Sequence, residues 1–384
     1  MKKFIILVFV LISIIALSSG LEISKKIRVV ILPAKASHGW LEADVDFLLS
    51  MLEEAMTDLG RFEVYSRSHV KEIMKERGLA QIGMTDVDAE KLGKLAGAQY
   101  VILLTLNNLD TGISDGKYWA SAQLSIRLLD ISNGEVVATK SIDYNTGNYF
   151  KSYDEAKKAL FEYIKMQFVI VMRKFFKLKA TVVKVENGKA YLKGVDPELL
   201  KVGMIFKIEG GLGKVGYVKI EKEENGYVIA DILYGDVKAG FPAKEMPLFG
   251  GGSALSLNYY SGLTSSNISA FGIGFTAWKN LYIEASYLAG SVLSYIPFDV
   301  VLGMRFNLIR LGRIYAGVHG GADILGIYDT DKEDVIMMTF GAAAGVDGRY
   351  EFDPTSGVFL KLDYKYLFGM GGFNALSAGY YMGF

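Results

Sequence analysis

The chain has 384 residues, with 42 basic and 42 acidic side chains and therefore no formal net charge at pH 7. Because the charges balance, the net charge of the whole chain does not indicate nucleic-acid binding. The absence of cysteine excludes disulfide bonds, thiolate metal sites, cysteine nucleophiles and a lipid-modified N-terminal cysteine.

Residues 1–20 are predicted to be a signal peptide. Lys2 and Lys3 precede an apolar run from Phe4 to Leu17, and small residues follow it. We expect cleavage after Ser18 or Gly20. The alternative is an uncleaved transmembrane anchor, but such a helix needs about 20 apolar residues.

Residues 21–177 are predicted to form an α/β domain in which helices pack on a sheet. A strand from Ile27 ends at Pro33, and a helix follows whose apolar residues recur every three or four positions until Gly60. Thr85 and Asp88 have the spacing of a capping box at the start of a short helix. Further elements are expected as a helix from Ser68 to Gly78 and as strands over residues 62–65, 100–106, 123–130 and 136–144.

The last helix of this domain is expected over residues 152–177. Ser152 and Glu155 again form a capping-box pattern at its start. One face of the helix is apolar, through Leu160, Ile164, Phe168, Val171 and Phe175. We expect this stripe to pack on the sheet; the alternative is a helix that binds a partner or a membrane surface.

The region around residues 25–147 resembles the curli-secretion (CsgG-like) family and the related lipoprotein activators of penicillin-binding proteins. The resemblance rests on the opening strand with Pro33 and on residues 60–67, 70–79, 91–101 and 128–138. It implies a non-enzymatic envelope protein with no catalytic residues. Two features differ: family members are usually lipoproteins, and the segment between the Tyr100 strand and the next hairpin is too short for the membrane hairpins of the curli pore.

Residues 178–246 are predicted to form a small all-β, SH3-like domain. Strands are expected over residues 180–185, 190–193, 204–209, 215–220 and 227–232. Asn187-Gly188 and Asn225-Gly226 are typical hairpin turns. Residues 200–204 and 235–237 resemble the small C-terminal barrel of the flagellar assembly protein T family.

Residues 247–384 are predicted to form an eight-stranded antiparallel transmembrane β-barrel, similar to outer-membrane barrels of the OmpA/OmpX type. Strands are expected over residues 253–261, 268–278, 281–290, 298–308, 313–325, 337–350, 357–368 and 374–384. In the seventh of these, Val358, Leu360 and Leu362 alternate with Lys361 and Asp363. An apolar outer face and a polar inner face are typical of a membrane barrel.

The inward faces of the predicted barrel carry charges of both signs. The residues expected to form a lumen charge network are Glu284, Asp299, Arg305, His319, Asp323, Asp347, Arg349, Lys361, Asp363 and Lys365. An eight-stranded barrel is just wide enough for side chains to fill, so these charges must pair. We therefore predict a closed, ion-paired lumen; the alternatives are a conducting channel or a catalytic or ligand-binding role.

The final residues Tyr380, Met382 and Phe384 share a face and resemble the C-terminal signal that the barrel assembly machinery reads. Short turns near residues 278–280, 310–312 and 352–354 are expected on the periplasmic side. Interfacial aromatic side chains are expected from Trp278, Tyr287, Tyr350, Tyr364 and Tyr380.

Motifs for other chemistries are incomplete. Gly211 to Gly216 matches the dinucleotide fingerprint, but a strand is predicted after it where a helix is needed, which indicates a hairpin turn. Residues 329–334 lack the glycine and the final glutamate of a calcium loop. His38, His69 and His319 lie in separate regions and match no triad or zinc spacing. We expect no enzyme activity, no cofactor and no metal.

Together these features predict a non-enzymatic scaffolding or assembly protein of the cell envelope. The barrel would anchor it in the outer membrane and present residues 21–246 to the periplasm. Its expected partners are outer-membrane lipid, the barrel assembly machinery and periplasmic or envelope proteins, with no nucleic acid. The sequence is compatible with an oligomer but does not determine the oligomeric state. The alternative is transport, either as a narrow channel or within an oligomeric secretion complex.

Overall fold

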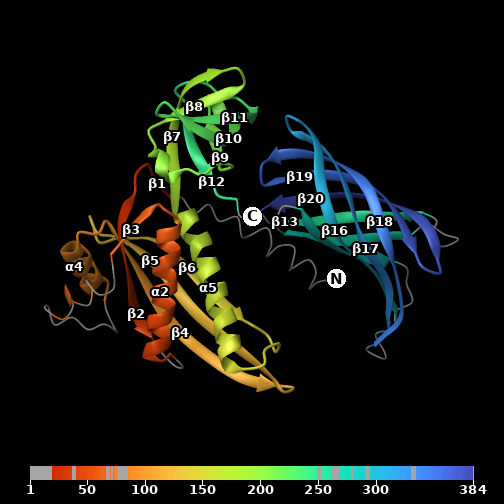
Figure 1. The fold of residues 1–384 in the computed structure, drawn as a ribbon, viewed down its shortest axis with the longest axis horizontal. Helices are drawn as coiled ribbons and strands as arrows, with labels where there is room; N and C mark the ends of the chain where they lie inside the picture. Colours follow the sequence, from red (N-terminus) through yellow and green to blue (C-terminus); the bar gives the residue numbers. More distant parts are fainter. Residues whose placement is uncertain are drawn as a thin grey trace.

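The computed structural model describes residues 20–36, 40–65, 70, 72–73, 75, 85–248, 252–261, 268–277, 280–289, 295–329 and 334–383. The predicted signal peptide up to residue 19, most of the helix expected from Ser68, and Trp278 and Phe384 lie outside this part of the chain. Figure 1 shows an α/β part, a small β part and a barrel. The small β part includes a short strand from the start of the described chain, which lies ahead of the α/β part in the sequence. Among the described residues no helix is long and apolar enough to cross a membrane.

The α/β part is a five-stranded sheet in the order β3-β2-β4-β5-β6. Its strands are β2 (Ile27–Ala36), β3 (Phe62–Val64), β4 (Tyr100–Ser114), β5 (Lys117–Asp130) and β6 (Val136–Asn145). Strand β2 runs parallel to β3 and β4, and the remaining pairs are antiparallel. Helices α2 (Glu42–Asp58) and α5 (Tyr153–Phe175) lie side by side on one face, and α4 (Asp86–Ala96) lies on the other (Figure 1).

Local sequence signals set the ends of these helices. The Thr85 hydroxyl accepts a hydrogen bond from the Asp88 amide, and the Asp88 carboxylate accepts one from Thr85, so the predicted capping box is present. The Ser152 hydroxyl accepts from the Glu155 amide at 3.2 Å. The expected stripe of α5 is buried and packs against the sheet, because an amphipathic helix is stable only when its apolar face is covered.

The hairpin of β4 and β5 is much longer than the sequence predicted. Strands expected over residues 100–106 and 123–130 instead continue to Ser114 and begin at Lys117. Asp115 and Gly116 join them with φ of 51° and 70°, the left-handed pair that suits a two-residue hairpin turn. Polar residues in this stretch hide the strand signal, because the distal half of the hairpin is largely solvent-exposed.

The small β part closes into a ring. Its strands are β1 (Leu21–Ile23), β7 (Phe176–Glu186), β8 (Lys189–Lys193), β9 (Ile205–Glu209), β10 (Val215–Glu224), β11 (Tyr227–Gly235) and β12 (Pro242–Met246). They follow the order β1-β7-β12-β9-β10-β11-β8, and β8 pairs back with β7. The sequence missed β12, whose first residue is Pro242; proline is tolerated at that position because no ladder donor is needed there.

The turns of the small β part agree with the sequence. Asn187-Gly188 and Asn225-Gly226 both have positive φ, as expected for the predicted hairpins. Gly211–Gly213 forms a short 3₁₀ turn, and strand β10 follows it. The dinucleotide-like motif is therefore the turn of a hairpin, as predicted.

One hydrophobic core extends through the α/β part and the small β part, with Leu104 from β4, Phe168 from α5 and Phe206 from β9 among its members. A buried ion pair joins the two parts beside this core. The guanidinium of Arg61 donates to both carboxylate oxygens of Glu245 at 2.6 Å, and both side chains are 1% exposed. Arg61 also donates to the Phe176 carbonyl, and the Leu178 amide donates to Glu245.

The C-terminal strands form a closed antiparallel barrel in which β20 pairs back with β13. The strands are β13 (Gly252–Ser261), β14 (Ile268–Ala277), β15 (Leu281–Ala289), β16 (Tyr295–Leu311), β17 (Ile314–Asp329), β18 (Asp334–Asp353), β19 (Ser356–Leu367) and β20 (Gly371–Gly383). This confirms the eight predicted strands. The end at which β13 begins and β20 ends is here termed the linker end, and the opposite end the far end.

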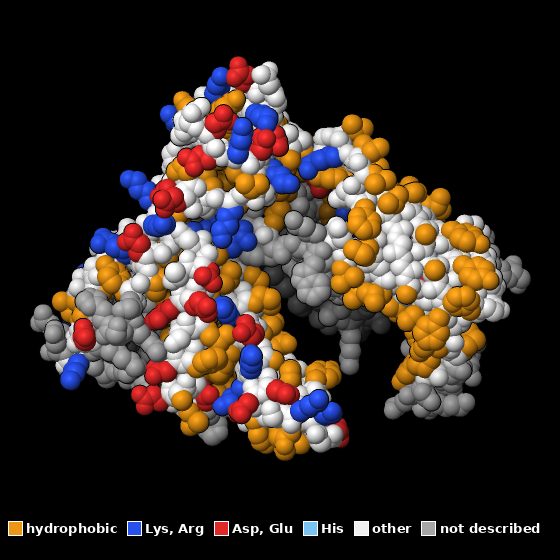
Figure 2. Space-filling model, in the orientation of Figure 1, with side chains coloured by type: hydrophobic (Ala, Val, Ile, Leu, Met, Phe, Trp, Pro, Cys, Tyr) orange, Lys and Arg blue, Asp and Glu red, His pale blue; other side chains and the backbone are white. Residues whose placement is uncertain are grey.

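The outer face of the barrel is apolar. Large hydrophobic side chains exposed on it include Leu257, Phe271, Leu302, Phe306, Val346, Leu360, Leu362 and Leu376. In Figure 2 the barrel surface is mostly orange and white, whereas red and blue side chains gather over the other two parts. Aromatic rings lie near both ends. Phe352 contacts Tyr350 and Tyr380 at the linker end, and Tyr366 contacts Phe368 at the far end.

Candidate functional site

The barrel interior collects the charged residues singled out in the sequence. Alternation along each strand directs one set of side chains outward and the other into the lumen. Asp299, Asp323, Asp347 and Asp363 are all buried, although their sequence neighbours on the outer face are exposed or half-exposed. The lumen side chains come from five of the strands, so ion pairs between them connect different walls of the barrel.

Asp347 is the centre of the group nearest the linker end. Its two carboxylate oxygens accept hydrogen bonds from Nε of Arg305 at 3.1 Å and Nε of Arg349 at 2.9 Å. Nδ1 of His319 lies 3.4 Å from the same carboxylate. One acid thus holds two arginines in place.

Asp363 continues this group toward the far end. It forms a short hydrogen bond with Nε2 of His319 and an ion pair of 2.9 Å with Nζ of Lys361. The same Lys361 nitrogen lies 2.6 Å from the Glu284 carboxylate. Glu284 is on β15 and Lys361 on β19, four strands apart around the ring, so this pair crosses the full width of the lumen.

A second group fills the lumen closer to the far end. Nζ of Lys365 forms a short ion pair with Asp299 and lies 3.5 Å from Asp323. The Tyr260 hydroxyl donates to Asp299 at 2.7 Å, and its ring lies 5.5 Å from the lysine nitrogen. These contacts again join separate strands, namely β13, β16, β17 and β19.

The structure therefore places every predicted lumen residue inside the barrel and joins them in two groups. Five acids face four bases and His319, so a proton on His319 gives equal numbers of each charge. Pairs that cross the lumen leave side chains, rather than open space, along its middle. Among the described residues no cluster of three or more His, Asp or Glu side chains could hold a metal ion.

Sequence reasoning from charges missed the uncharged part of this network. Tyr260 bonds to Asp299, and Asn258 donates to the Ser286 hydroxyl at 2.6 Å in the buried lumen. The same two-residue alternation in β13 and β15 marks all three as inward-facing, so the signal was present. Tyr380 of the predicted assembly signal lies on the outer face, Met382 is half-buried, and Phe384 lies outside the described residues.

The barrel also touches the small β part at its linker end. The guanidinium groups of Arg310 and Arg313 lie 5.6 Å and 4.9 Å from the centre of the Tyr234 ring. Tyr217 packs beside Tyr234 at 5.2 Å, and both are buried. Burial, followed by the nearby Glu351 carboxylate, raises the pKa of Tyr234 well above its usual range. Its phenol therefore stays neutral.

Replacing Tyr234 by alanine is expected to loosen the barrel from the small β part without unfolding either, because it removes both cation–π contacts. Limited proteolysis of the linker around residues 247–251 measures this, and cleavage should be several-fold faster. Tyr227→Ala is the matched control, since Tyr227 is on the same strand but contacts Tyr191 and Lys193 within the small β part. Equal rates for both variants would contradict the contact.

A family model matches part of the chain. Residues 45–154 match the family described as "Curli production assembly/transport component CsgG". The resemblance inferred from the sequence is confirmed over this segment, which includes α2, α4 and the β4–β6 sheet. No curated protein matches the chain significantly.

Several solved structures each resemble only part of the chain. The lipoprotein GNA1162 from Neisseria meningitidis is 19% identical over 38% of this chain and 99% of its own, with a TM-score of 0.30. The LpoB C-terminal domain from Escherichia coli is 16% identical over 35% and 92%, with a TM-score of 0.26. Neisserial surface protein A is 12% identical over 35% and 96%, with a TM-score of 0.28. These scores are all below 0.5, so the likenesses carry no argument about function.

Proposed function

We propose that this protein is a non-enzymatic assembly or scaffolding factor of the cell envelope, anchored by its barrel in an outer membrane. The barrel spans the bilayer, and residues 21–246 lie in the periplasm and bind envelope proteins. They form a CsgG-like domain and, from about residue 177, an SH3-like domain, to which the N-terminal strand β1 also pairs. One observation carries the proposal: a closed barrel with an apolar outer face and an ion-paired lumen is joined to an α/β part that matches the CsgG family.

The apolar outer face supports the anchor. A lipid-exposed barrel needs outward apolar side chains and aromatic rings at both interfaces. A water-soluble barrel needs the opposite arrangement, with charged side chains on its outer face and apolar side chains inside. Here the charges are inside and paired, and the apolar side chains are outside.

The filled lumen favours anchoring over conduction. Lys361 and Glu284 meet across the middle of the barrel, and Lys365 with Asp299 and Tyr260 fills the next layer. Breaking such pairs to open a path would expose unpaired buried charges at a cost of several kcal/mol. The binding activity is therefore assigned to the α/β part.

Transport is the second candidate, because the matching family is described as an assembly/transport component. In that case the chain would act in an oligomeric secretion complex or as a narrow channel. Conductance in planar bilayers, together with a large native complex, would favour this function over scaffolding.

The test begins with cell fractionation and electrophoresis with and without boiling. We expect the protein in outer membranes, with a band that shifts on heating as folded barrels do. Photo-crosslinkers at Val87 and Val136, both exposed on the α/β part, should then capture specific envelope proteins in cells. A soluble protein without a heat shift would contradict the anchor, and conductance without captured partners would contradict scaffolding.

Replacing Leu360 by arginine is expected to impair membrane insertion. Leu360 is 56% exposed on the outer face, in the middle of β19, and arginine near the bilayer midplane of a barrel costs about 2–4 kcal/mol. The measurement is the heat-shifted fraction after refolding into phosphatidylcholine vesicles. Val202→Arg is the control, because Val202 is 76% exposed on the small β part and faces no lipid. Equal folding of both variants would contradict a lipid-facing surface.

A further inference from the structure

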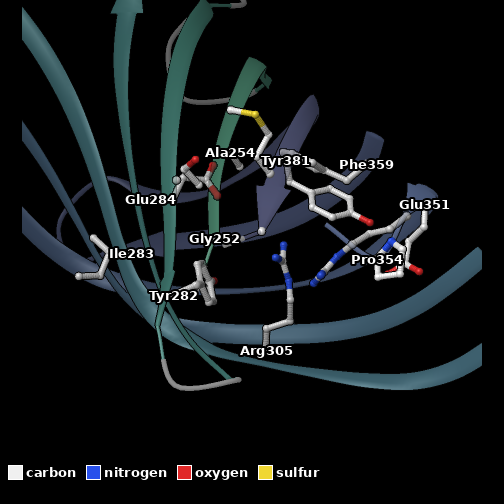
Figure 3. Close-up of a pocket in the computed structure, with 15 residues that line it drawn as sticks. Gly252, Ala254, Tyr282, Ile283, Glu284, Arg305, Glu351, Pro354, Phe359 and Tyr381 are labelled. Atoms are coloured by element: carbon white, nitrogen blue, oxygen red, sulfur yellow. The ribbon is translucent and has the colours of Figure 1, made fainter. Parts of the chain in front are cut away.

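The lumen has a cavity of about 200 Å³ at the linker end. Its walls include Tyr282, Glu284, Arg305, Arg349, Glu351 and Tyr381. Figure 3 shows Tyr282, Arg305 and Tyr381 extending into the space that the strands enclose. This cavity is termed the linker-end cup; Glu284 in its wall pairs across the lumen with Lys361.

The cup contains hydrogen-bond donors without acceptors. Nη2 of Arg349 and the hydroxyl groups of Tyr282 and Tyr381 are buried and have no hydrogen-bond partner among the described residues. Leaving a buried donor without a partner is energetically unfavourable. Three such atoms in the wall of one cavity indicate that the cavity normally holds an acceptor.

The two arginines are held in place for such an acceptor. Both use Nε to bind Asp347, and Nη2 of Arg349 has no partner among the described residues. Arg305 lies 5.4 Å from the Tyr282 ring centre and Arg349 lies 5.8 Å from that of Tyr381. Each guanidinium is thus fixed by a carboxylate and an aromatic ring, so little side-chain freedom is lost on binding.

The acids in the wall have cationic partners of their own. Glu284 is bound to Lys361 at 2.6 Å, and Glu351 lies 3.5 Å from Arg310. The groups of the cup that have no partner are hydrogen-bond donors. Because the planar guanidinium of arginine presents parallel N–H donors, it matches anionic oxygens best.

We propose that the linker-end cup binds a small phosphate-type oxyanion, held by the guanidinium groups of Arg305 and Arg349 and the hydroxyl groups of Tyr282 and Tyr381. The donors come from four strands, β15, β16, β18 and β20, and so surround the ligand. A tetrahedral oxyanion accepts bonds from several sides, whereas a planar carboxylate is served by a single arginine fork. The cup is smaller than drug-sized pockets of about 300–1,000 Å³, which fits a phosphate group.

The test is calorimetric titration of the detergent-solubilised full-length mature chain with inorganic phosphate in chloride buffer at constant ionic strength. We expect saturable binding at one site and weaker binding of acetate. Arg349→Gln should lower phosphate affinity about tenfold or more, because it removes a hydrogen bond between charged groups. Tyr381→Phe, which keeps the shape of the wall, should lower it several-fold.

Arg313→Gln is the matched control, because Arg313 lies at the same barrel end but does not line the cup; it should bind phosphate normally. The heat shift on gels reports whether each variant folds. If Arg349→Gln does not fold, the phosphate affinity of Tyr381→Phe tests the proposal. No saturable phosphate binding, or equal binding by Tyr381→Phe and the parent chain, would overturn the proposal and leave water as the acceptor. Acetate binding as tight as phosphate would overturn the tetrahedral ligand.

Discussion

Replacing Arg61 by methionine should destabilise the α/β and small β parts by about 3–5 kcal/mol, the usual cost of breaking a buried ion pair. Glu245, at 1% exposure, would lose two hydrogen bonds of 2.6 Å and its bidentate cation. Arg173, 3.3 Å away, is a poor substitute because it is partly exposed and also bonds to the Leu248 carbonyl. Pulse proteolysis of the detergent-solubilised chain in increasing urea gives the midpoint shift.

Two further variants separate this effect from a general loss of charge. Arg61→Met combined with Glu245→Leu should recover much of the stability, because apolar residues of similar size often replace a buried pair without loss. Lys26→Met removes an exposed pair with Glu198 and should leave the urea midpoint nearly unchanged. An Arg61→Met midpoint equal to that of Lys26→Met would show that the buried pair does not join the two parts.

Replacing Lys365 by methionine should prevent most of the barrel from folding. Lys365 is the cation between Asp299 and Asp323, and all three are buried. Without it two carboxylates face each other in the lumen, which costs about 3–5 kcal/mol for the broken pair. The heat-shifted fraction after refolding in detergent measures the loss.

A rescue experiment tests whether the loss of folding comes from the two unpaired carboxylates. Adding Asp299→Asn and Asp323→Asn to Lys365→Met removes the unpaired charges, and the Tyr260 hydroxyl keeps an acceptor at position 299. Folding should then largely return, whereas Arg313→Gln at the barrel rim should fold like the parent chain. If Lys365→Met alone folds fully, the lumen ion pairs contribute little to closure.

The sequence by itself determined the elements whose signals are local. Alternation in β19, with Leu360 and Leu362 opposite Lys361 and Asp363, defined both the strand and its two faces, because the side-chain period of a strand is two. The capping box at Thr85 and the N-cap hydroxyl of Ser152 marked helix starts, since these hydrogen bonds form within one turn. At Ser152 the box is incomplete, because the Glu155 carboxylate accepts from the Lys151 amide instead. The barrel and its strand number therefore followed from the sequence.

Local signals failed where strands extend into water or begin irregularly. The long hairpin of β4 and β5 is partly solvent-exposed, so its distal half has no apolar alternation to recognise. Strand β12 is short and starts at Pro242, and β1 is a three-residue strand added to β7. Each is stabilised by its neighbours in the folded sheet rather than by its own composition.

Only the tertiary structure decided which distant residues meet. Arg61 and Glu245 are 184 positions apart, and Lys361 reaches Glu284 only because β15 and β19 stand opposite each other in the closed ring. The donors of the linker-end cup likewise come from four strands. The spacing of residues in the sequence determines which face of a strand a side chain occupies and which residue caps a helix, because both depend on near neighbours. The partner of a buried charge depends instead on how distant strands and helices pack in the folded chain.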